Sequence, residues 1–132
     1  MSIIKFLSTR NAGYTRSEIA AGIGCSSGGT FSQALSALIE SDFIIKYVPF
    51  GYSKRMEHYK LVDSFCMFYI KFVKNKSELN ETFWQHNQVA HSVVSWRGFA
   101  FEGICFNHIN QIKKSLGISG VSATYSAWSK RE

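Results

Sequence analysis

The stretch TRSEIAAGIGCSSGGTFSQALSALIESDFIIKYVPFGYSKRMEHYKLV, residues 15–62, carries the pattern that decides the fold. Thr15 and Glu18 have the spacing of a capping box, so we expect a short helix that ends at the glycines of GIG. After the turn CSSGG, Thr30 and Gln33 repeat this spacing, and apolar residues recur at helical intervals behind them. Two helices joined by a glycine-rich turn predict a helix-turn-helix.

The second part of the same stretch predicts a β-hairpin. FIIKYV and MEHYKLV are rich in β-branched and aromatic residues, and PFGYSKR between them contains the only proline and the basic pair Lys54 and Arg55. A further helix is expected upstream, because the apolar residues of SIIKFL recur at helical spacing. Three helices followed by a hairpin within residues 1–62 is the order of a winged helix-turn-helix, in which the hairpin is the wing.

The remaining sequence predicts two helices, a connector and a strand. Asp63 is placed to cap an aromatic helix in SFCMFYIKFV, and the polar residues that follow indicate a connector. A long helix is predicted from Val94 to Leu116, with Gly117 ending it, and the alternation in VSATYSAW predicts a strand at Val121–Trp128. The chain is therefore expected to be mainly α, in the α+β class. Its expected parts are residues 1–62, 63–93 and 94–132.

Composition narrows the class of protein. The 132 residues are 45% hydrophobic and 15% aromatic, which is enough to bury a core. No run approaches the roughly 18 apolar residues of a membrane helix, and MSIIKFLSTR lacks the pattern of a signal peptide, so we expect a cytoplasmic protein without a membrane partner. The three cysteines are widely spaced and form no C-x-x-C, which favours reduced thiols over disulfides or a zinc site.

The charge pattern favours an acidic partner such as duplex DNA. The net charge is +6, shared evenly between residues 1–62 and 63–132. In a winged helix, the third helix enters the major groove and the wing meets phosphates. The candidate DNA contacts are Arg16, Ser27, Ser32, Gln33, Ser36, Lys54 and Arg55. Serine and glutamine discriminate bases weakly, so little sequence specificity is expected. Winged helices also serve as protein–protein adaptors, and this alternative stays open.

The residues indicate neither an enzyme nor a bound cofactor or metal in this chain. The four histidines have no cysteines or carboxylates at ligand spacing, and no G-x-x-x-x-G-K-[ST] motif occurs. Glu102 lies in the long predicted helix, at the border of an apolar stripe, where a carboxylate at the rim of a packed face is expected. That stripe consists of Phe101, Ile104, Cys105, Ile109, Ile112 and Leu116.

Several segments together resemble one family. TRSEIAAGIGCSSGGTFSQALSALIESDFI, the wing, LVDSFCMFYIKFV, WRGFAFEGIC and LGISGVSATYSAW are similar to the C-terminal half of bacterial relatives of the archaeal-type AAA ATPases. The resemblance implies an N-terminal P-loop ATPase module, then a winged helix, then a restriction-endonuclease-like region. It implies that ATP and Mg²⁺ belong to missing parts of a parent protein, whose ATPase module is a partner of this chain.

The resemblance also assigns an expected role to the C-terminal part. Residues 94–132 become the first helix and strand of a truncated nuclease-like region, and Glu102 matches a helical metal-site glutamate of nuclease members. The Asp and E-x-K residues that complete such a site do not follow Leu116. The resemblance therefore implies a non-catalytic fragment, with part of a metal-dependent nuclease as the less favoured alternative. The unpaired strand expected at Val121–Trp128 can join a second copy of the chain, which makes a homodimer an open alternative.

Overall fold

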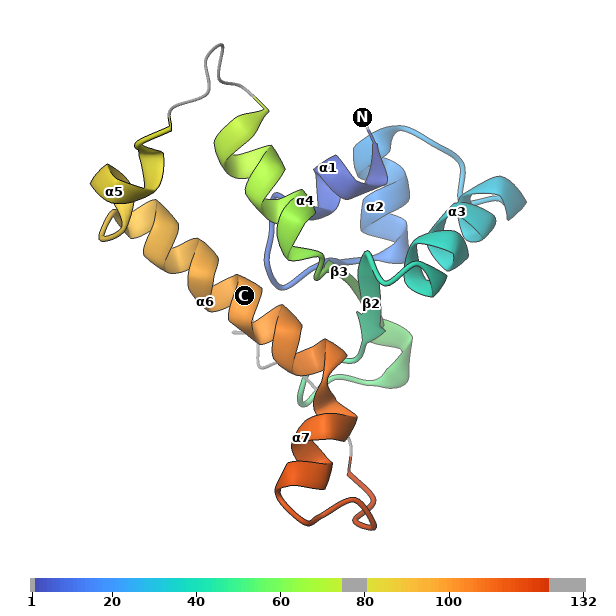
Figure 1. Cartoon of the computed structure of the whole chain (residues 1–132). Coiled ribbons are helices and arrows are strands. Elements are labelled where there is room, and N and C mark those ends of the chain that lie inside the picture. Colours follow the sequence, from blue (N-terminus) through green and yellow to red (C-terminus); the bar gives the residue numbers. More distant parts are fainter. Residues whose placement is uncertain (1, 75–80, 124–132) are drawn as a thin grey trace. The chain divides into compact units, whose positions relative to one another are not determined.

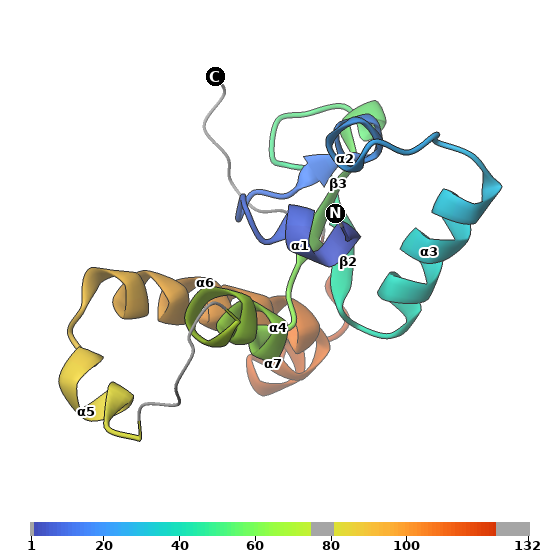
Figure 2. The same ribbon diagram turned by 90° about the horizontal axis from the view of Figure 1, so that it is seen from above.

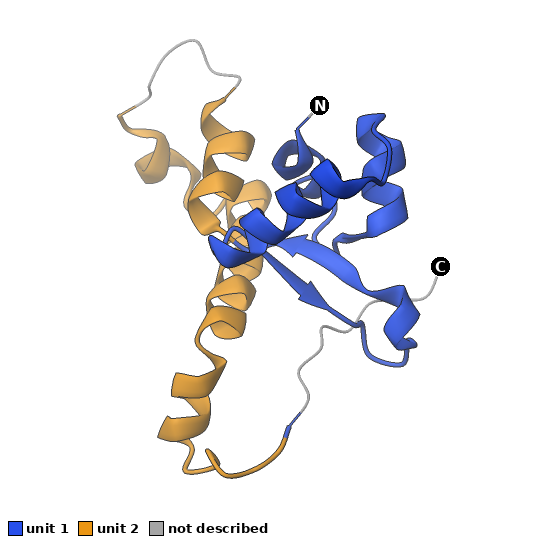
Figure 3. Ribbon diagram, turned by 90° about the vertical axis from the view of Figure 1, so that its right-hand side faces the viewer, with its two compact units in different colours: residues 1–62, 123–132 blue, residues 63–122 orange. Residues whose placement is uncertain are grey.

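The computed structural model describes residues 2–74 and 81–123 (Figure 1). The protein is mainly helical, with a small three-stranded antiparallel sheet, as expected for the α+β class. The chain divides into two compact units, one built on Met1–Val62 and the other on Asp63–Ser122 (Figure 3). Within the described ranges, no helix combines the length and the apolar character needed to cross a bilayer.

The first unit contains the predicted helices and hairpin. Its elements are α1 (Ile3–Leu7), β1 (Tyr14–Thr15), α2 (Arg16–Ile23), α3 (Gly29–Glu40), β2 (Ile44–Tyr47), the 3₁₀ helix η1 (Lys54–Met56) and β3 (His58–Leu61). The strand order is β1-β3-β2, with Tyr14 opposite Tyr59 and Ile44 opposite Leu61. Strand β1 was not predicted, because two residues are too short to show an alternating pattern. Helix α1 packs on α2, and α3 packs beside β2 (Figure 2).

The capping box at the start of α2 is confirmed. The Oγ1 of Thr15 accepts from the Glu18 amide, and the Glu18 carboxylate accepts from the Thr15 amide at 2.6 Å. The second predicted capping pair, Thr30 with Gln33, is wrong. Helix α3 already begins at Gly29, after an extended Gly28 that provides no side-chain cap, so Thr30 lies inside the first helical turn.

The core of the first unit is mainly apolar, with Lys60 as a buried charged residue, and it depends on close contacts at two glycines. Its buried side chains include Leu7, Ile19, Phe31, Leu35, Ile44 and Leu61. Gly13 has a φ of 72°, and a Cβ there would overlap the Tyr59 carbonyl, so β1 reaches β3 only because position 13 lacks a side chain. A Cβ at Gly22 would likewise overlap the ring of Phe6, so α1 and α2 pack closely at this glycine.

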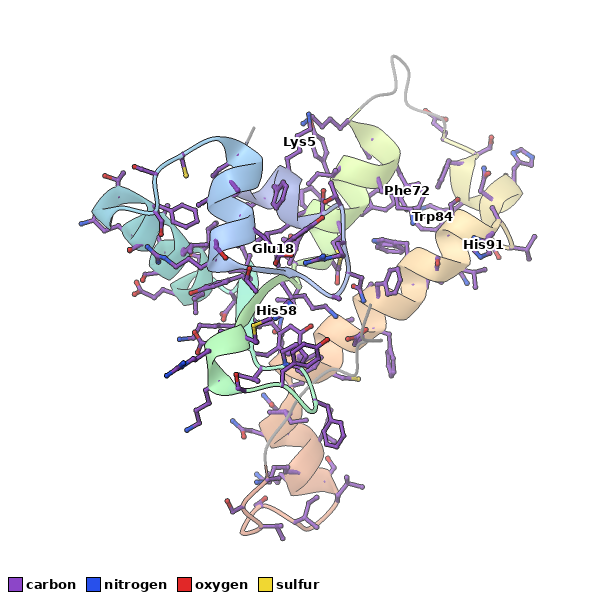
Figure 4. All side chains as sticks on the ribbon, turned by 180° about the vertical axis from the view of Figure 1, so that it is seen from behind. Lys5, Glu18, His58, Phe72, Trp84 and His91 are labelled. Atoms are coloured by element: carbon purple, nitrogen blue, oxygen red, sulfur yellow. The ribbon has the colours of Figure 1, made fainter. Side chains whose placement is uncertain are left out.

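The second unit is helical and is organised by an aromatic cluster. Its elements are α4 (Ser64–Phe68), the π-helix η2 (Tyr69–Val73), α5 (Phe83–Asn87), α6 (His91–Asn107) and α7 (Ile109–Ser115). The predicted cap of α4 is confirmed, because Asp63 Oδ1 accepts from the Cys66 amide at 2.6 Å. Trp96 of α6 lies 5.4 Å from Phe68 and 6.0 Å from Trp84, ring centre to ring centre. The aromatic cluster comprises Phe68, Phe72, Phe83, Trp84 and Trp96. Figure 4 labels two of them, Phe72 and Trp84.

Two predictions for the second unit are wrong. The connector through residue 93 contains α5 and the start of α6, and the single helix predicted from Val94 to Leu116 is broken at His108, which has φ −114° and ψ 22°. The Ile104 carbonyl accepts there from both the His108 amide and its ring Nδ1. The end of α7 agrees with the sequence, since Gly117 follows it with a φ of 69°.

Half of the apolar stripe predicted for this region is exposed. Phe101, Ile104 and Leu116 are 68%, 49% and 66% exposed, whereas Cys105, Ile109 and Ile112 are half-buried and α6 buries Val93 and Ala100 on one side. Trp96 lies on that buried side, because the rings of α4 and α5 pack against it. Residues 121–123 are not in a strand, and the rest of the predicted strand lies outside the described residues.

Candidate nucleic-acid interface

Arg16, the first residue of α2, connects that helix to the turn before α3. Its Nε donates to Ser27 Oγ at 3.1 Å, and its Nη2 donates to the Ser27 carbonyl at 3.0 Å and to Ser32 Oγ at 2.7 Å. The guanidinium carbon also lies 5.1 Å from the centre of the Phe31 ring. These bonds engage Nε and Nη2, while the two N–H groups of Nη1 form no hydrogen bond with a described residue.

This geometry changes the role of two predicted contacts. Ser27 and Ser32 were expected to face DNA bases, but their hydroxyl oxygens accept hydrogen bonds from Arg16. Ser32 Oγ also bonds the carbonyl of Gly28 at 3.1 Å, which ties it to the start of α3. The two serines therefore fix the position of an arginine.

Lys54 and Arg55 lie in η1, in the loop that connects β2 to β3. A backbone bond of 2.9 Å from the Met56 amide to the Ser53 carbonyl closes this turn. Both basic side chains are exposed, and neither forms a hydrogen bond or an ion pair with any residue in the described ranges. Their charges therefore remain available to an external anion.

Residues from α2, the turn before α3 and the hairpin loop line one open pocket of about 560 Å³, the basic pocket. It brings together four of the seven candidate residues. The lining residues are Thr15, Arg16, Ser17, Ala20, Cys25, Ser27, Lys54, Arg55, Glu57 and Tyr59. Glu57 contributes a carboxylate to this lining, but Glu57 Oε1 lies 3.2 Å from Lys46 Nζ, so a cation outside the lining balances its charge. Three cations and several hydroxyl groups make the pocket suited to a phosphate or another oxyanion.

The other candidate residues lie elsewhere. Gln33 and Ser36 are exposed on α3, and neither lines the basic pocket. Glu40 is the only charged residue of α3. The face predicted to read bases is thus separate from the basic pocket and carries no cation.

Sequence reasoning missed several lining residues. Tyr59 reaches the pocket because β3 pairs with β1, and no sequence signal marks that pairing. Thr15 was recognised only as a helix cap, although it caps α2 and lines the pocket. Ser17 also lines the pocket and is exposed. Its position in sequence next to the predicted cation Arg16 is the local signal by which it could have been found.

Glu18 stabilises the chain at the edge of the pocket. Partial burial opposes its ionisation, but bonds from the Thr15 amide and hydroxyl, together with Arg10 at 3.0 Å, hold the pKa of the Glu18 carboxyl below its usual value. The carboxylate stays ionised at neutral pH and accepts hydrogen bonds from Arg10 and Thr15. Glu18 is labelled in Figure 4.

Glu102, the residue matched to a nuclease metal site, lies half-buried on α6. Within the described residues, no group of three His, Cys, Asp or Glu side chains is close enough to hold a metal ion.

Comparison with protein-family models, with curated proteins and with solved structures found no match to this chain. The basic pocket, with its three cations, is therefore the candidate functional surface of this chain.

Proposed function

We propose that residues 1–62 form a winged helix-turn-helix module that contacts duplex DNA through its phosphates. The observation that carries this proposal is the convergence of Arg16 with Lys54 and Arg55 in one open pocket. Arginine and lysine are the residues that most often bind DNA phosphates, and nearby hydroxyl groups add donors. Helices α1 to α3 followed by the β2–β3 hairpin have the element order of such a module.

The balance of charge in the first unit supports the same function. Of its other cations, Arg10 pairs with Glu18 at 3.0 Å and Lys46 pairs with Glu57 at 3.2 Å. Lys60 is 1% exposed, so it does not reach solvent. Among residues 2–62, the accessible positive charge that no carboxylate balances is thus concentrated at the basic pocket, with Lys5 of α1 as the remaining exposed cation of that range.

We also propose that the chain is a non-catalytic C-terminal region of a larger P-loop ATPase. The sequence resemblance alone supports this part, and ATP and Mg²⁺ would then be bound by the ATPase module of the parent. The reading frame tests it: a Walker A motif upstream of Met1, and an Asp followed by E-x-K downstream of Glu132, are expected. An open reading frame that extends in both directions without either motif would contradict the assignment.

A protein adaptor is the second candidate function, and one observation favours it. Phe50 in the β2–β3 loop is 72% exposed, and Met56 in η1 is 40% exposed. Exposed apolar side chains at a loop tip are typical of protein contacts. In this alternative, the hairpin loop packs on the ATPase module or on another protein without touching DNA.

Titration of a fluorescent duplex separates these two functions. Three phosphate contacts predict that log affinity falls with log salt with a slope of about −2.7, which is about a 40-fold loss between 50 and 200 mM salt. The double variant Lys54→Ala/Arg55→Ala is expected to bind at least about tenfold more weakly and to reduce the slope to about −1.

The matched control is Lys5→Ala/Lys114→Ala, which removes the same charge from exposed positions outside the pocket. Its affinity is expected to change by less than about threefold, because neither lysine lines the pocket that is proposed to hold the phosphates. Absence of binding at 50 mM salt would reject DNA contact and favour the adaptor. Equal losses in the two double variants would show that only net charge matters and would reject the pocket.

A further inference from the structure

We infer that the basic pocket, and not the outer face of α3, is the principal DNA-binding surface, so that the module binds backbone phosphodiesters without reading base sequence. This inference rests on the proposed DNA contact and goes further by assigning that contact to one surface and excluding base readout by α3. It also departs from the expectation that the third helix reads the major groove.

Arg16 is the fixed element of this surface. Its three hydrogen bonds to Ser27 and Ser32 hold the guanidinium group in place before any ligand arrives. A donor group that is already ordered loses little side-chain entropy on binding. The two N–H groups of Nη1, which bond no described residue, point in different directions, so each can donate to a separate phosphodiester oxygen. Arg16 therefore provides a directional contact at a defined position.

Lys54 and Arg55 contribute differently. They are exposed in a short 3₁₀ turn and form no ion pair or hydrogen bond with the described part of the chain. Flexible cations such as these attract phosphates by charge and adapt to either strand of a duplex. Lys54 and Arg55 line the same pocket as Arg16. The three cations therefore contact neighbouring phosphates along one stretch of the DNA backbone.

The start of α3 adds a donor surface at the pocket margin. Ser27 lines the pocket directly before Gly28, and Gly28 caps α3 without a side-chain hydrogen bond. Gly28 and Gly29 are both exposed. The first amides of this 12-residue helix and its positive dipole end are therefore open to an anion that Arg16 already holds nearby.

The outer face of α3 has the opposite character. Its exposed residues are Thr30, Gln33, Ser36, Ala37 and Glu40. It has no arginine, lysine or asparagine, and Glu40 repels phosphates along the groove. Gln33 is the only side chain on this face that can make a bidentate contact with a base. The hydroxyl of Ser32, next in sequence, bonds Arg16. A face with this composition supplies little affinity and little discrimination.

A binding experiment with the full chain tests this inference. The probes are four 20-base-pair duplexes of unrelated sequence, two rich in A·T and two rich in G·C, at 50 mM salt. The variants are Arg16→Lys for the fixed contact, Lys54→Ala/Arg55→Ala for the flexible cations, and Gln33→Ala/Ser36→Ala for the face of α3. Urea unfolding of each variant shows whether a loss of binding is a loss of folding.

The affinities for the four duplexes are expected to agree within about threefold, because contacts to the DNA phosphates do not depend on base sequence. Lys54→Ala/Arg55→Ala weakens binding to all four by a similar factor of at least about ten, and Gln33→Ala/Ser36→Ala changes it by less than about twofold. Arg16→Lys keeps the charge but loses the planar donor group, so we expect about a tenfold loss with an almost unchanged salt slope.

Other outcomes separate the two proposals. Binding to none of the duplexes rejects the proposed function and this inference with it. Binding that varies more than tenfold among the sequences, or that is lost in Gln33→Ala/Ser36→Ala, leaves DNA contact standing but rejects the pocket as the principal surface. Uniform binding that survives the pocket variants rejects the assignment of the pocket.

Discussion

Arg16 Nη2 donates a hydrogen bond of 2.7 Å to Ser32 Oγ and thereby joins the first residue of α2 to the first turn of α3. The intervening turn, residues 24–28, begins and ends with a glycine, which has no side chain to fix either helix. With the two bonds to Ser27, this contact makes Arg16 both a structural tie and the fixed cation of the basic pocket.

The first prediction concerns this tie. Arg16→Ala is expected to lower the free energy of unfolding by about 1–2 kcal/mol, because it removes three hydrogen bonds that are partly exposed to water. Urea unfolding followed by circular dichroism measures the change. Arg55→Ala is the control, with an expected change within about 0.5 kcal/mol, since Arg55 is exposed in the hairpin loop. Equal effects of the two substitutions would show that Arg16 has no structural role.

The second prediction concerns Gly13, where the backbones of β1 and β3 meet. Gly13→Ala is expected to destabilise the chain by at least about 1–3 kcal/mol, because it combines a positive φ with overlap of the Tyr59 carbonyl. Gly98→Ala is the matched control within α6. Its added methyl group meets open space, and alanine favours a helix over glycine. The free energy of unfolding is therefore expected to rise by about 0.5–1 kcal/mol. A neutral Gly13→Ala variant would contradict the observed approach of the two strands.

The third prediction is the pH dependence that comes from Glu18. Its folded-state pKa is below the ordinary value of 4.5, so its contribution to stability is present above pH 4.5 and is lost as the pH falls through the folded-state pKa. Glu18→Gln is expected to lose no more than about 1 kcal/mol at pH 7, because the Arg10 pair is exposed. Urea unfolding between pH 3 and 6 should show a shallower decrease for Glu18→Gln. Identical pH profiles would show that Glu18 has the same pKa in both states.

The fourth prediction compares cysteine reactivity. Burial, together with the hydrogen bond and negative charge of Asp63, raises the pKa of the Cys66 thiol to about 11, so very little thiolate forms at pH 8. Cys25 is exposed, so iodoacetamide at pH 8 is expected to label it well before Cys66. Peptide mapping by mass spectrometry follows both sites.

A substitution at the α4 cap controls this comparison. Asn retains a side-chain oxygen that can cap α4 but has no charge, so Asp63→Asn is expected to speed the labelling of Cys66 while Cys25 stays unchanged. If Cys66 reacts as fast as Cys25 in the unsubstituted protein, its raised pKa is disproved.

The predictions that succeeded depend on residues close together in sequence. The Thr15 to Glu18 capping box and the Asp63 cap were predicted because each spans one helical turn. The hairpin was predicted because β-branched segments flank a turn that contains proline and glycine. Thr30 and Gln33 have the same spacing as a real capping box, but the N-cap of α3 is Gly28, two residues before Thr30. Spacing alone does not show which of several nearby residues takes the N-cap position.

The predictions that failed depend on contacts between distant segments. Periodicity placed Phe101 and Leu116 on a packed face, yet the rings of Phe68 and Trp84 pack on the side of α6 that carries Trp96. Several sides of this helix are apolar, so its pattern does not state which one a neighbour covers.

The sequence by itself determined the order of helices and hairpin in the first unit, two of the helix caps and the identity of the cations near the proposed DNA contact. These follow from local backbone preferences and from residue charge. Only the tertiary structure decided that Arg16, Lys54 and Arg55 line one pocket, that Ser27 and Ser32 hold Arg16, and that Gln33 and Ser36 lie elsewhere. The physical reason is that β1 pairs with β3 through Gly13 and α2 follows β1 directly, so long-range backbone pairing positions the cations.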